Sequence, residues 1–407
     1  MQKNTPKKIL VLTTIYPAPD LKYRTSVVHY FTKEWIKMGY DVNVIYFHAV
    51  YHKIFYLMAR LFREQIASIT GAVVDTSDNF GFTQYDIDGV HVYRLPIFKL
   101  IPRGRYSKKV LTEKLRKIVE INEETGFKPD ILIGHFSNPQ LNIIYNLKEF
   151  YPFAKTCIVM HDNGESIKKI YKAEYTEYLK CIDFWGYRSI PIKASFENNF
   201  GKQKNSFMCY SGIPESYLTK ECTKKFSEKI TEFVYVGELI KRKYPTTIIK
   251  ALNRLYTEET NYKISYVGSG GEEKNLKKLT VKYGIQKNVL FLGYLERNEV
   301  INILDRAECF IMISKDEAFG LVYLEAMARG CITIGSKNEG IDGVIQHGIN
   351  GFLCEHGNEE ELMSVINQIN SLTQIERKAI SNNAIKTALE MTDYKVAKNY
   401  INAIDKI

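Results

Sequence analysis

The sequence predicts an α/β protein built from two doubly wound domains, each with a parallel sheet covered by helices. A chain of 407 residues is long for a single hydrophobic core, so two domains of about 200 residues each are expected. In both halves, short apolar runs rich in β-branched residues alternate with helical segments, which is the order of βαβ units. Glycine turns follow several of these runs.

The first half shows this order clearly. Residues 8–14 and 41–47 have the composition of buried strands, and residues 29–38 between them predict a helix. Residues 130–134 and 156–160 predict two further strands. The first strand is not followed by Gly-x-Gly-x-x-Gly, the pattern that binds dinucleotides, so a nicotinamide oxidoreductase is not expected.

The second half repeats the order after a polar, charged segment, residues 220–229, which we interpret as an interdomain linker. Predicted strands and helices alternate from there to the end of the second domain. The strands cover residues 232–236, 262–267, 289–292, 309–313 and 332–334, and the helices residues 245–256, 272–284, 297–306 and 321–329.

The positive charge is concentrated in the first half. The net charge is +10, and residues 1–220 hold 31 Lys and Arg against 21 Asp and Glu. Residues 94–117 combine nine basic residues and one acid with interleaved Phe, Leu and Ile, which suits the surface of an anionic membrane. A solvated helix face is an equally weighted interpretation, and residues 53–67 are a second candidate patch. The residues assigned to this acceptor or membrane face are Arg103, Arg105, Lys108 and Lys109.

Cysteine usage and hydropathy predict the compartment. The seven cysteines are scattered, without a Cys-x-x-Cys pair, and several lie in apolar runs where they resemble small buried hydrophobes. The N-terminus passes directly into a strand without a signal peptide, and no apolar run approaches the length of a membrane span. We therefore expect a cytoplasmic protein, with the inner face of the cell membrane as a peripheral location.

Residues 314–330 carry the strongest functional signal, because they predict a strand end, a glycine turn and a helix with a carboxylate on each side of the turn. Glu317 precedes the turn at Gly320, and Glu325 follows it on the helix. A helix that begins after glycine offers free amides and a positive dipole end to a diphosphate. For an isolated pair, the favoured interpretation is a dipole-facing charge and an ordinary exposed helix residue. The neighbouring motifs favour a sugar-nucleotide site instead.

These neighbouring motifs are glycine turns that follow successive predicted strands. Gly237, Gly268, Gly293 and Gly320 each come shortly after a strand, so they are expected at one edge of one sheet. The cations at residues 241–243 (Lys-Arg-Lys) follow the first of these turns and are placed to neutralise a pyrophosphate.

The second half resembles the donor-binding domain of glycosyltransferase family 4, the retaining enzymes of GT-B fold. The resemblance rests on residues 235–243 (YVGELIKRK), 266–271 (YVGSGG), 289–294 (VLFLGY), 317–330 and 340–352, in matching order and spacing. It implies two Rossmann-like domains that face each other across a cleft. Residues 1–218 would bind the acceptor, residues 219–390 the donor, and residues 391–407 would form a helix that crosses back to the first domain.

The resemblance also implies residue roles. Glu317 would hold donor-sugar hydroxyls, Glu325 the ribose and Lys243 the diphosphate, and His161 would reach from the acceptor domain into the cleft. The family commonly has Arg after the glycine matching Gly237, where this chain has Glu238, so Arg242 is the candidate replacement cation. The catalytic candidates are Glu317, Lys243 and His161. The other donor-binding candidates are Gly237, Arg242, Gly268, Gly293, Tyr294, Leu295, Phe319, Gly320, Leu321 and Glu325.

The predicted function is transfer of a hexose-type sugar, with retention, from a nucleoside-diphosphate sugar to a glycan or lipid-linked acceptor. Family analogy points to bacterial capsule, exopolysaccharide or lipopolysaccharide synthesis. No Asp-x-Asp triplet is identified that would carry a metal on the diphosphate, so neither a metal nor another cofactor is expected. An anionic membrane is a second candidate partner, and nucleic acid is not expected. The alternatives are a sugar-nucleotide epimerase or hydrolase, or a non-catalytic sugar-nucleotide or membrane-binding protein.

Overall fold

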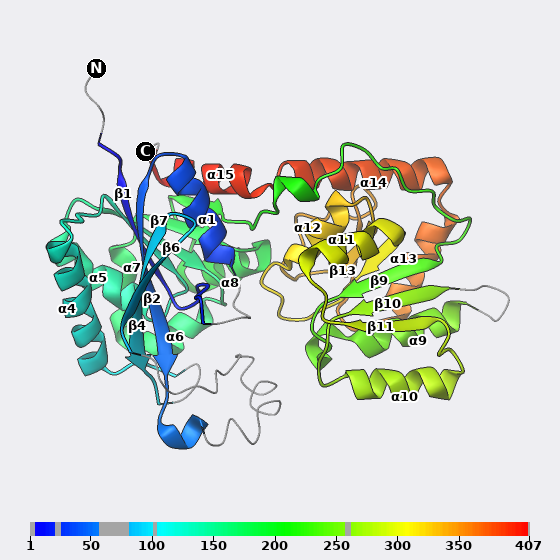
Figure 1. Cartoon of the computed structure of the whole chain (residues 1–407), viewed down its shortest axis with the longest axis horizontal. Coiled ribbons are helices and arrows are strands. Elements are labelled where there is room, and N and C mark those ends of the chain that lie inside the picture. The colour runs from blue at the N-terminus through cyan, green and yellow to red at the C-terminus, as the bar shows by residue number, and fades with distance from the viewer. Residues whose placement is uncertain (1–4, 21–25, 57–80, 101–103, 257–261, 406–407) are drawn as a thin grey trace. The chain divides into compact units, whose positions relative to one another are not determined.

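The computed structural model describes residues 5–20, 26–56, 81–100, 104–256 and 262–405, and the chain forms two compact units (Figure 1). The first unit comprises residues 1–188, 192–209 and 396–407, and the second comprises residues 189–191 and 210–395. Each unit is a mainly parallel sheet with helices on both faces, which confirms the predicted fold class.

The first unit contains an eight-stranded sheet in the order β3-β4-β2-β1-β5-β6-β7-β8, in which only the β3–β4 pair is antiparallel. Its strands are β1 (Lys8–Thr13), β2 (Asp41–Val50), β3 (Thr83–Ile87), β4 (Val90–Phe98), β5 (Ile131–His135), β6 (Lys155–Met160), β7 (Phe184–Tyr187) and β8 (Ser206–Met208). Its helical segments are α1 (Val27–Lys37), α4 (Lys108–Glu124), α5 (Gln140–Phe150), α6 (Glu165–Tyr171), η1 (Lys172–Glu174), α7 (Tyr175–Lys180), α8 (Ile190–Phe200) and α15 (Asp393–Asp405).

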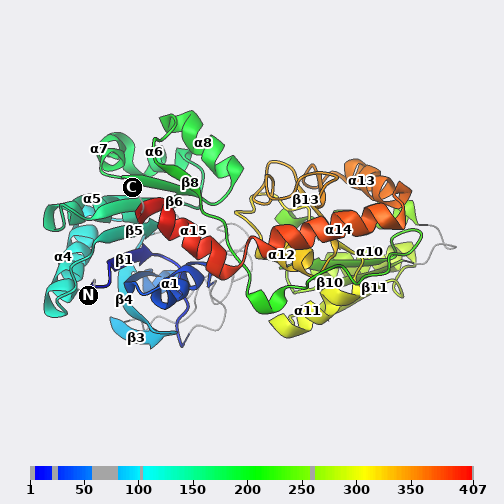
Figure 2. The same ribbon diagram turned by 90° about the horizontal axis from the view of Figure 1, so that it is seen from above.

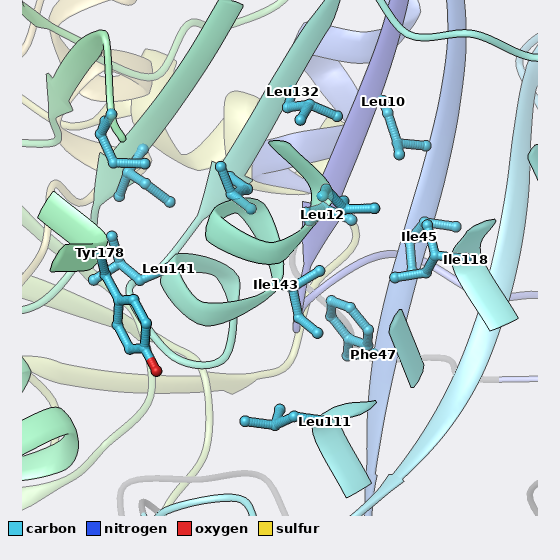
Figure 3. Close-up of a cluster of buried hydrophobic side chains, with 14 of the residues drawn as sticks. Leu10, Leu12, Ile45, Phe47, Leu111, Ile118, Leu132, Leu141, Ile143 and Tyr178 are labelled. Carbon is cyan, nitrogen blue, oxygen red and sulfur yellow. The ribbon is translucent and has the colours of Figure 1, made fainter. Parts of the chain in front are cut away.

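The core of the first unit lies between one face of this sheet and the helices α4, α5 and α7. Leu10 and Leu12 of β1 belong to the same buried cluster as Leu111 of α4 and Leu141 of α5 (Figure 3). Residues 9–12 are all fully buried, because helices cover both faces of the sheet. The continuous apolar run of β1 is therefore explained by burial on both faces.

The C-terminal helix α15 packs on the first unit although the chain reaches it from the second (Figure 2). The indole of Trp35 in α1 donates a hydrogen bond to the carbonyl of Ala397 at 2.9 Å, and its ring meets that of Tyr400 with centroids 5.0 Å apart. The hydroxyl of Tyr40 donates to Asp405 at 3.0 Å. These contacts make α15 an integral part of the first unit.

The second unit has a six-stranded, fully parallel sheet in the order β11-β10-β9-β12-β13-β14. Helices α9 and α10 pack together on one face, and α12 packs against α14 on the other (Figure 1). The strands are β9 (Glu232–Val236), β10 (Lys263–Val267), β11 (Val289–Gly293), β12 (Cys309–Ile311), β13 (Ile332–Ser336) and β14 (Phe352–Cys354). The helical segments are η2 (Glu215–Tyr217), η3 (Lys241–Lys243), α9 (Pro245–Leu255), α10 (Glu273–Tyr283), α11 (Arg297–Arg306), α12 (Leu321–Ala328), α13 (Glu359–Ser371) and α14 (Gln374–Leu389).

The boundary between the units differs from the predicted one. The main division falls between residues 209 and 210, earlier than residue 218, and residues 220–229 are not a free linker. Cys222 and Phe226 are buried, and the amide of Cys222 donates to the side chain of Asn382 at 2.9 Å. The buried guanidinium of Arg377 donates to backbone carbonyls of this segment. The second unit therefore binds this polar stretch to its own surface.

Candidate active site

The carboxyl edge of the second sheet brings three of the predicted glycine turns into direct contact. The amide of Gly237 donates to the carbonyl of Val267 at 2.9 Å, and that of Gly268 donates to Gly293 at 2.6 Å. A Cβ atom at Gly268, where φ is +125°, would lie 2.1 Å from the carbonyl oxygen of Gly237. The glycines therefore allow three neighbouring strands to end against one another without side chains between them.

Beside this edge, the cations of η3 meet the loop that carries Glu317. The ammonium of Lys243 lies 3.6 Å from Oε2 of Glu317, and the guanidinium of Arg242 lies 3.4 Å from the same atom. The amide of Lys315 donates to the carbonyl of Arg242 at 2.7 Å, which joins the two loops through their backbones. The side chains of Lys243 and Glu317 are 14% and 16% exposed, whereas that of Arg242 is 42% exposed. Lys243 is therefore the more shielded cation.

The turn before α12 requires glycine at residue 320. Gly320 has a φ of +80°, and a Cβ atom there would lie 2.6 Å from the ring of Tyr323. That ring is fully buried, and its hydroxyl donates to the carbonyl of Met312 at 2.7 Å. Leu321 begins the helix, so its amide is one of those left without an intrahelical partner. Phe319 is buried, with its ring centroid 5.5 Å from that of Tyr210.

Glu325 is a buried carboxylate rather than an exposed helix residue. Only 8% of Glu325 is exposed, and the guanidinium of Arg297 lies 3.3 Å from its Oε1. Burial raises the pKa of Glu325, and the charge of Arg297 opposes that rise. Arg297 begins α11, and its guanidinium lies 5.6 Å from the ring centre of Tyr217. The sequence interpretation did not include Arg297, although it lies only four residues beyond the turn at Gly293.

In the first unit, His161 directly follows β6 and pairs with a second histidine. Nε2 of His161 lies 3.0 Å from Nδ1 of His135, the last residue of the adjacent strand β5. The ring of Phe136 stacks on His161 with centroids 4.0 Å apart. Burial lowers the pKa of both histidines, that of His135 to about 3, and the positive charge of Arg188 acts in the same direction. Both rings are therefore neutral at pH 7, and His135 was not predicted from the sequence.

The remaining predicted residues are more widely distributed. Tyr294 is exposed and Leu295 is half-buried beyond β11. Arg105 and Lys108 both form ion pairs with Glu174, each at 2.7 Å. Lys109 borders a groove of about 720 Å³ between β4 and α4. Arg103 lies outside the described residues, as does most of the candidate patch over residues 53–67.

In the part of the chain that the structure describes, carboxylates do not gather into a metal site. The sequence interpretation overlooked one Asp-x-Asp triplet, at Asp86 and Asp88 on the β3–β4 hairpin of the first unit. Asp88 accepts hydrogen bonds from Lys33 at 2.8 Å and from His29 at 2.9 Å. Within the described ranges, no three His, Cys, Asp or Glu side chains are close enough to share a metal ion. The same ranges include no helix with the length and apolar character of a membrane span.

The two doubly wound units and the glycine-lined sheet edge define a protein of the GT-B class. Comparison with known proteins agrees with this fold class: residues 221–387 match the family described as "Glycosyl transferases group 1".

Two curated relatives are similar to part of this chain. The chain is 37% identical over 140 residues to N-acetyl-alpha-D-glucosaminyl L-malate synthase of Bacillus anthracis, which covers 34% of this chain and 35% of that protein. It is 28% identical over 154 residues to the lipopolysaccharide core biosynthesis glycosyltransferase LpsE of Rhizobium meliloti, covering 38% of this chain and 41% of that protein. The matches thus span less than half of the length of these relatives.

The fold of the whole chain is shared with solved structures. Anabaena Alr3699/HepE in complex with UDP superposes with a TM-score of 0.68 over 98% of this chain and 100% of that one, at 15% identity. Together with the family match, this confirms the resemblance to GT-B glycosyltransferases that residues 235–352 indicated.

Proposed function

We propose that this protein is a retaining glycosyltransferase that uses a nucleoside-diphosphate sugar and requires no divalent metal. The observation that carries the proposal is the cluster of Lys243, Arg242 and Glu317 at the glycine-lined edge of a glycosyltransferase group 1 domain. Two cations suit a diphosphate, and a carboxylate between them and the start of α12 suits sugar hydroxyls. The solved structure of Anabaena Alr3699/HepE with UDP supports a nucleotide ligand on this fold.

The proposed chemistry assigns each group one role. The bond between the sugar C1 and the diphosphate oxygen breaks, and C1 forms a bond to the acceptor oxygen on the same face. The acceptor proton passes to an oxygen of the departing diphosphate. Lys243 and Arg242 offset the charge that develops on that diphosphate, and Glu325 accepts hydrogen bonds from the ribose. Neutral His161 contacts the transferred sugar from the first unit.

The proposed acceptor is a glycan or a lipid-linked sugar in the assembly of bacterial surface polysaccharide. The relative named for lipopolysaccharide core biosynthesis supports this setting. We further propose that Arg105, Lys108 and Lys109 face the acceptor or the anionic inner face of the cell membrane. Lys109 lines a groove that combines lysines with Phe82 and Leu95, which favours a ligand with both charged and apolar parts.

Calorimetric titration with UDP, GDP and ADP tests the donor site, first in EDTA and then with magnesium. Micromolar binding of one nucleotide in EDTA is expected, and it would identify the base of the donor. Binding that requires magnesium would contradict metal independence. No binding of any nucleotide would favour a non-catalytic protein, while release of free sugar without an acceptor would favour a hydrolase.

A further inference from the structure

We propose that Glu339 is a positioning residue that holds the loop of Glu317 in place, an inference whose catalytic consequence rests on the proposed function. Oε2 of Glu339 accepts a hydrogen bond from the backbone amide of Glu317 at 3.0 Å. The next residue, Gly340, donates its own amide to the carbonyl of Glu317 at 2.9 Å. Two consecutive residues after β13 thus bind both backbone polar groups of Glu317.

The hydrogen bonds of Glu339 and Gly340 to the backbone of Glu317, which we call the clamp, leave the loop little room to shift. A Cβ atom at Gly340 would lie 2.4 Å from three backbone atoms of residues 317–319, so the two segments are in backbone-to-backbone contact. Asp316, directly before Glu317, has a φ of +54°, a left-handed conformation that is costly for residues other than glycine. Such a conformation persists only where surrounding contacts hold it, and the carboxylate of Glu339 supplies one of those contacts.

The other oxygen of Glu339 connects the clamp to the cations of η3. Oε1 lies 3.8 Å from Nδ1 of His356, and the ring of His356 stacks on Tyr244 with centroids 6.0 Å apart. Tyr244 directly follows Lys243, whose ammonium meets the Glu317 carboxylate. Lys243 contacts the side chain of Glu317, and Glu339 binds its backbone. These two residues are therefore joined through the rings of Tyr244 and His356.

The same contacts predict which part of the donor depends on Glu339. Lys243 faces the diphosphate in the proposed site, whereas Glu317 faces the sugar. Removal of the Glu339 carboxylate releases the backbone of Glu317. The hydrogen bond from the amide of Lys315 to the carbonyl of Arg242 stays, so η3 remains attached to the start of the same loop. Affinity for a nucleoside diphosphate should persist, and the transfer or release of the sugar should slow.

Amide hydrogen exchange of the segment 314–320 tests the clamp without any ligand. In Glu339→Ala, the Glu317 amide should exchange at least about tenfold faster than in the unaltered protein, which corresponds to about 1.4 kcal/mol of lost protection. Glu339→Gln keeps an oxygen that accepts the same hydrogen bond and should restore most of the protection. Asp342→Ala is the matched control, because Asp342 accepts an amide hydrogen bond from Asn338 in the same connection but does not touch Glu317. Unchanged exchange in Glu339→Ala would overturn the proposal.

Nucleotide titration and sugar-nucleotide turnover of the same variants distinguish a positioning role of Glu339 from a general loss of folding stability. Glu339→Ala should bind the nucleoside diphosphate within about twofold of the unaltered protein, while kcat falls about tenfold with little change in KM. Equal loss of nucleotide binding and thermal stability would show a merely structural role and overturn the inference. If the unaltered protein binds none of the three nucleotides, the proposed function fails, and the exchange comparison still decides whether Glu339 holds the loop.

Discussion

Replacement of the cations of η3, one at a time, should separate a shielded catalytic charge from an exposed one. A unit charge about 4 Å from a phosphate oxygen contributes about 4 kcal/mol at an effective dielectric constant of about 20, and about 1 kcal/mol in bulk water. The side chain of Lys243 is 14% exposed, so its contribution lies toward the larger energy. The side chain of Arg242 is 42% exposed, so its contribution lies toward the bulk-water value. Because Glu317 already offsets part of the Lys243 charge, we expect a loss of about 3 kcal/mol for Lys243→Ala, or about 100-fold in turnover. Arg242→Ala should cost about fivefold.

The assay is sugar-nucleotide turnover with the nucleotide that binds in calorimetry, together with thermal unfolding of each variant. Lys241→Ala is the matched control, because Lys241 lies on the same turn but is exposed. It should retain the rate of the unaltered protein within about twofold, since an exposed charge is screened by water. Turnover of Lys243→Ala within threefold of the unaltered protein, at unchanged thermal stability, would refute this reasoning. Equal losses in the Lys243 and Lys241 variants would do the same, since they would indicate a diffuse effect of net charge.

Three further predictions follow from the charges of the two units. Arg297→Ala leaves the buried Glu325 carboxylate without its cation, so its pKa should rise further and nucleotide affinity measured by calorimetry should fall about tenfold at pH 6 and recover toward pH 8. His135 has a pKa of about 3 in the folded chain against 6.5 for a free histidine, so between pH 7 and pH 5 it takes up a proton only in the unfolded state; in urea unfolding it should account for about 2 kcal/mol of lost stability over that range, and His135→Gln should remove this part of the pH slope while the part due to His161 stays. Binding to vesicles of anionic lipid should weaken when Lys108 and Lys109 are both changed to Glu and when salt is raised, and failure to bind at low salt would remove the membrane proposal.

The sequence predicted the parts of the site that have a local signal. A buried strand followed by glycine marks a strand end, and strand ends of a parallel sheet share one edge, so the contact among Gly237, Gly268 and Gly293 could be anticipated. The ion pair of Lys243 with Glu317 joins two loops from neighbouring strands of the same edge. Whether these residues act on a donor as the resemblance implies stays a prediction.

The parts that the sequence did not predict depend on contacts between distant segments. Arg297 and Glu339 are ordinary charged residues in polar stretches, and only the folded chain brings them to Glu325 and Glu317. His135 directly follows the apolar run that predicts the strand at residues 130–134, and that run predicts a strand without it. The polar composition of residues 220–229 suggested a linker, but their few apolar side chains are buried and their backbone is bound by Arg377. A composition average does not reveal which single residues anchor a segment.

The attachment of α15 to the first unit has a consequence for the order in which the protein forms. Ribosomes add roughly 5 to 20 residues per second, so residues 38–392 separate the synthesis of α1 from that of α15 by a delay on the order of tens of seconds. Throughout that interval Trp35 lacks the helix that covers it in the finished protein. The apolar surface of the first unit that α15 covers in the finished protein therefore stays uncovered until the last helix of the chain has been made.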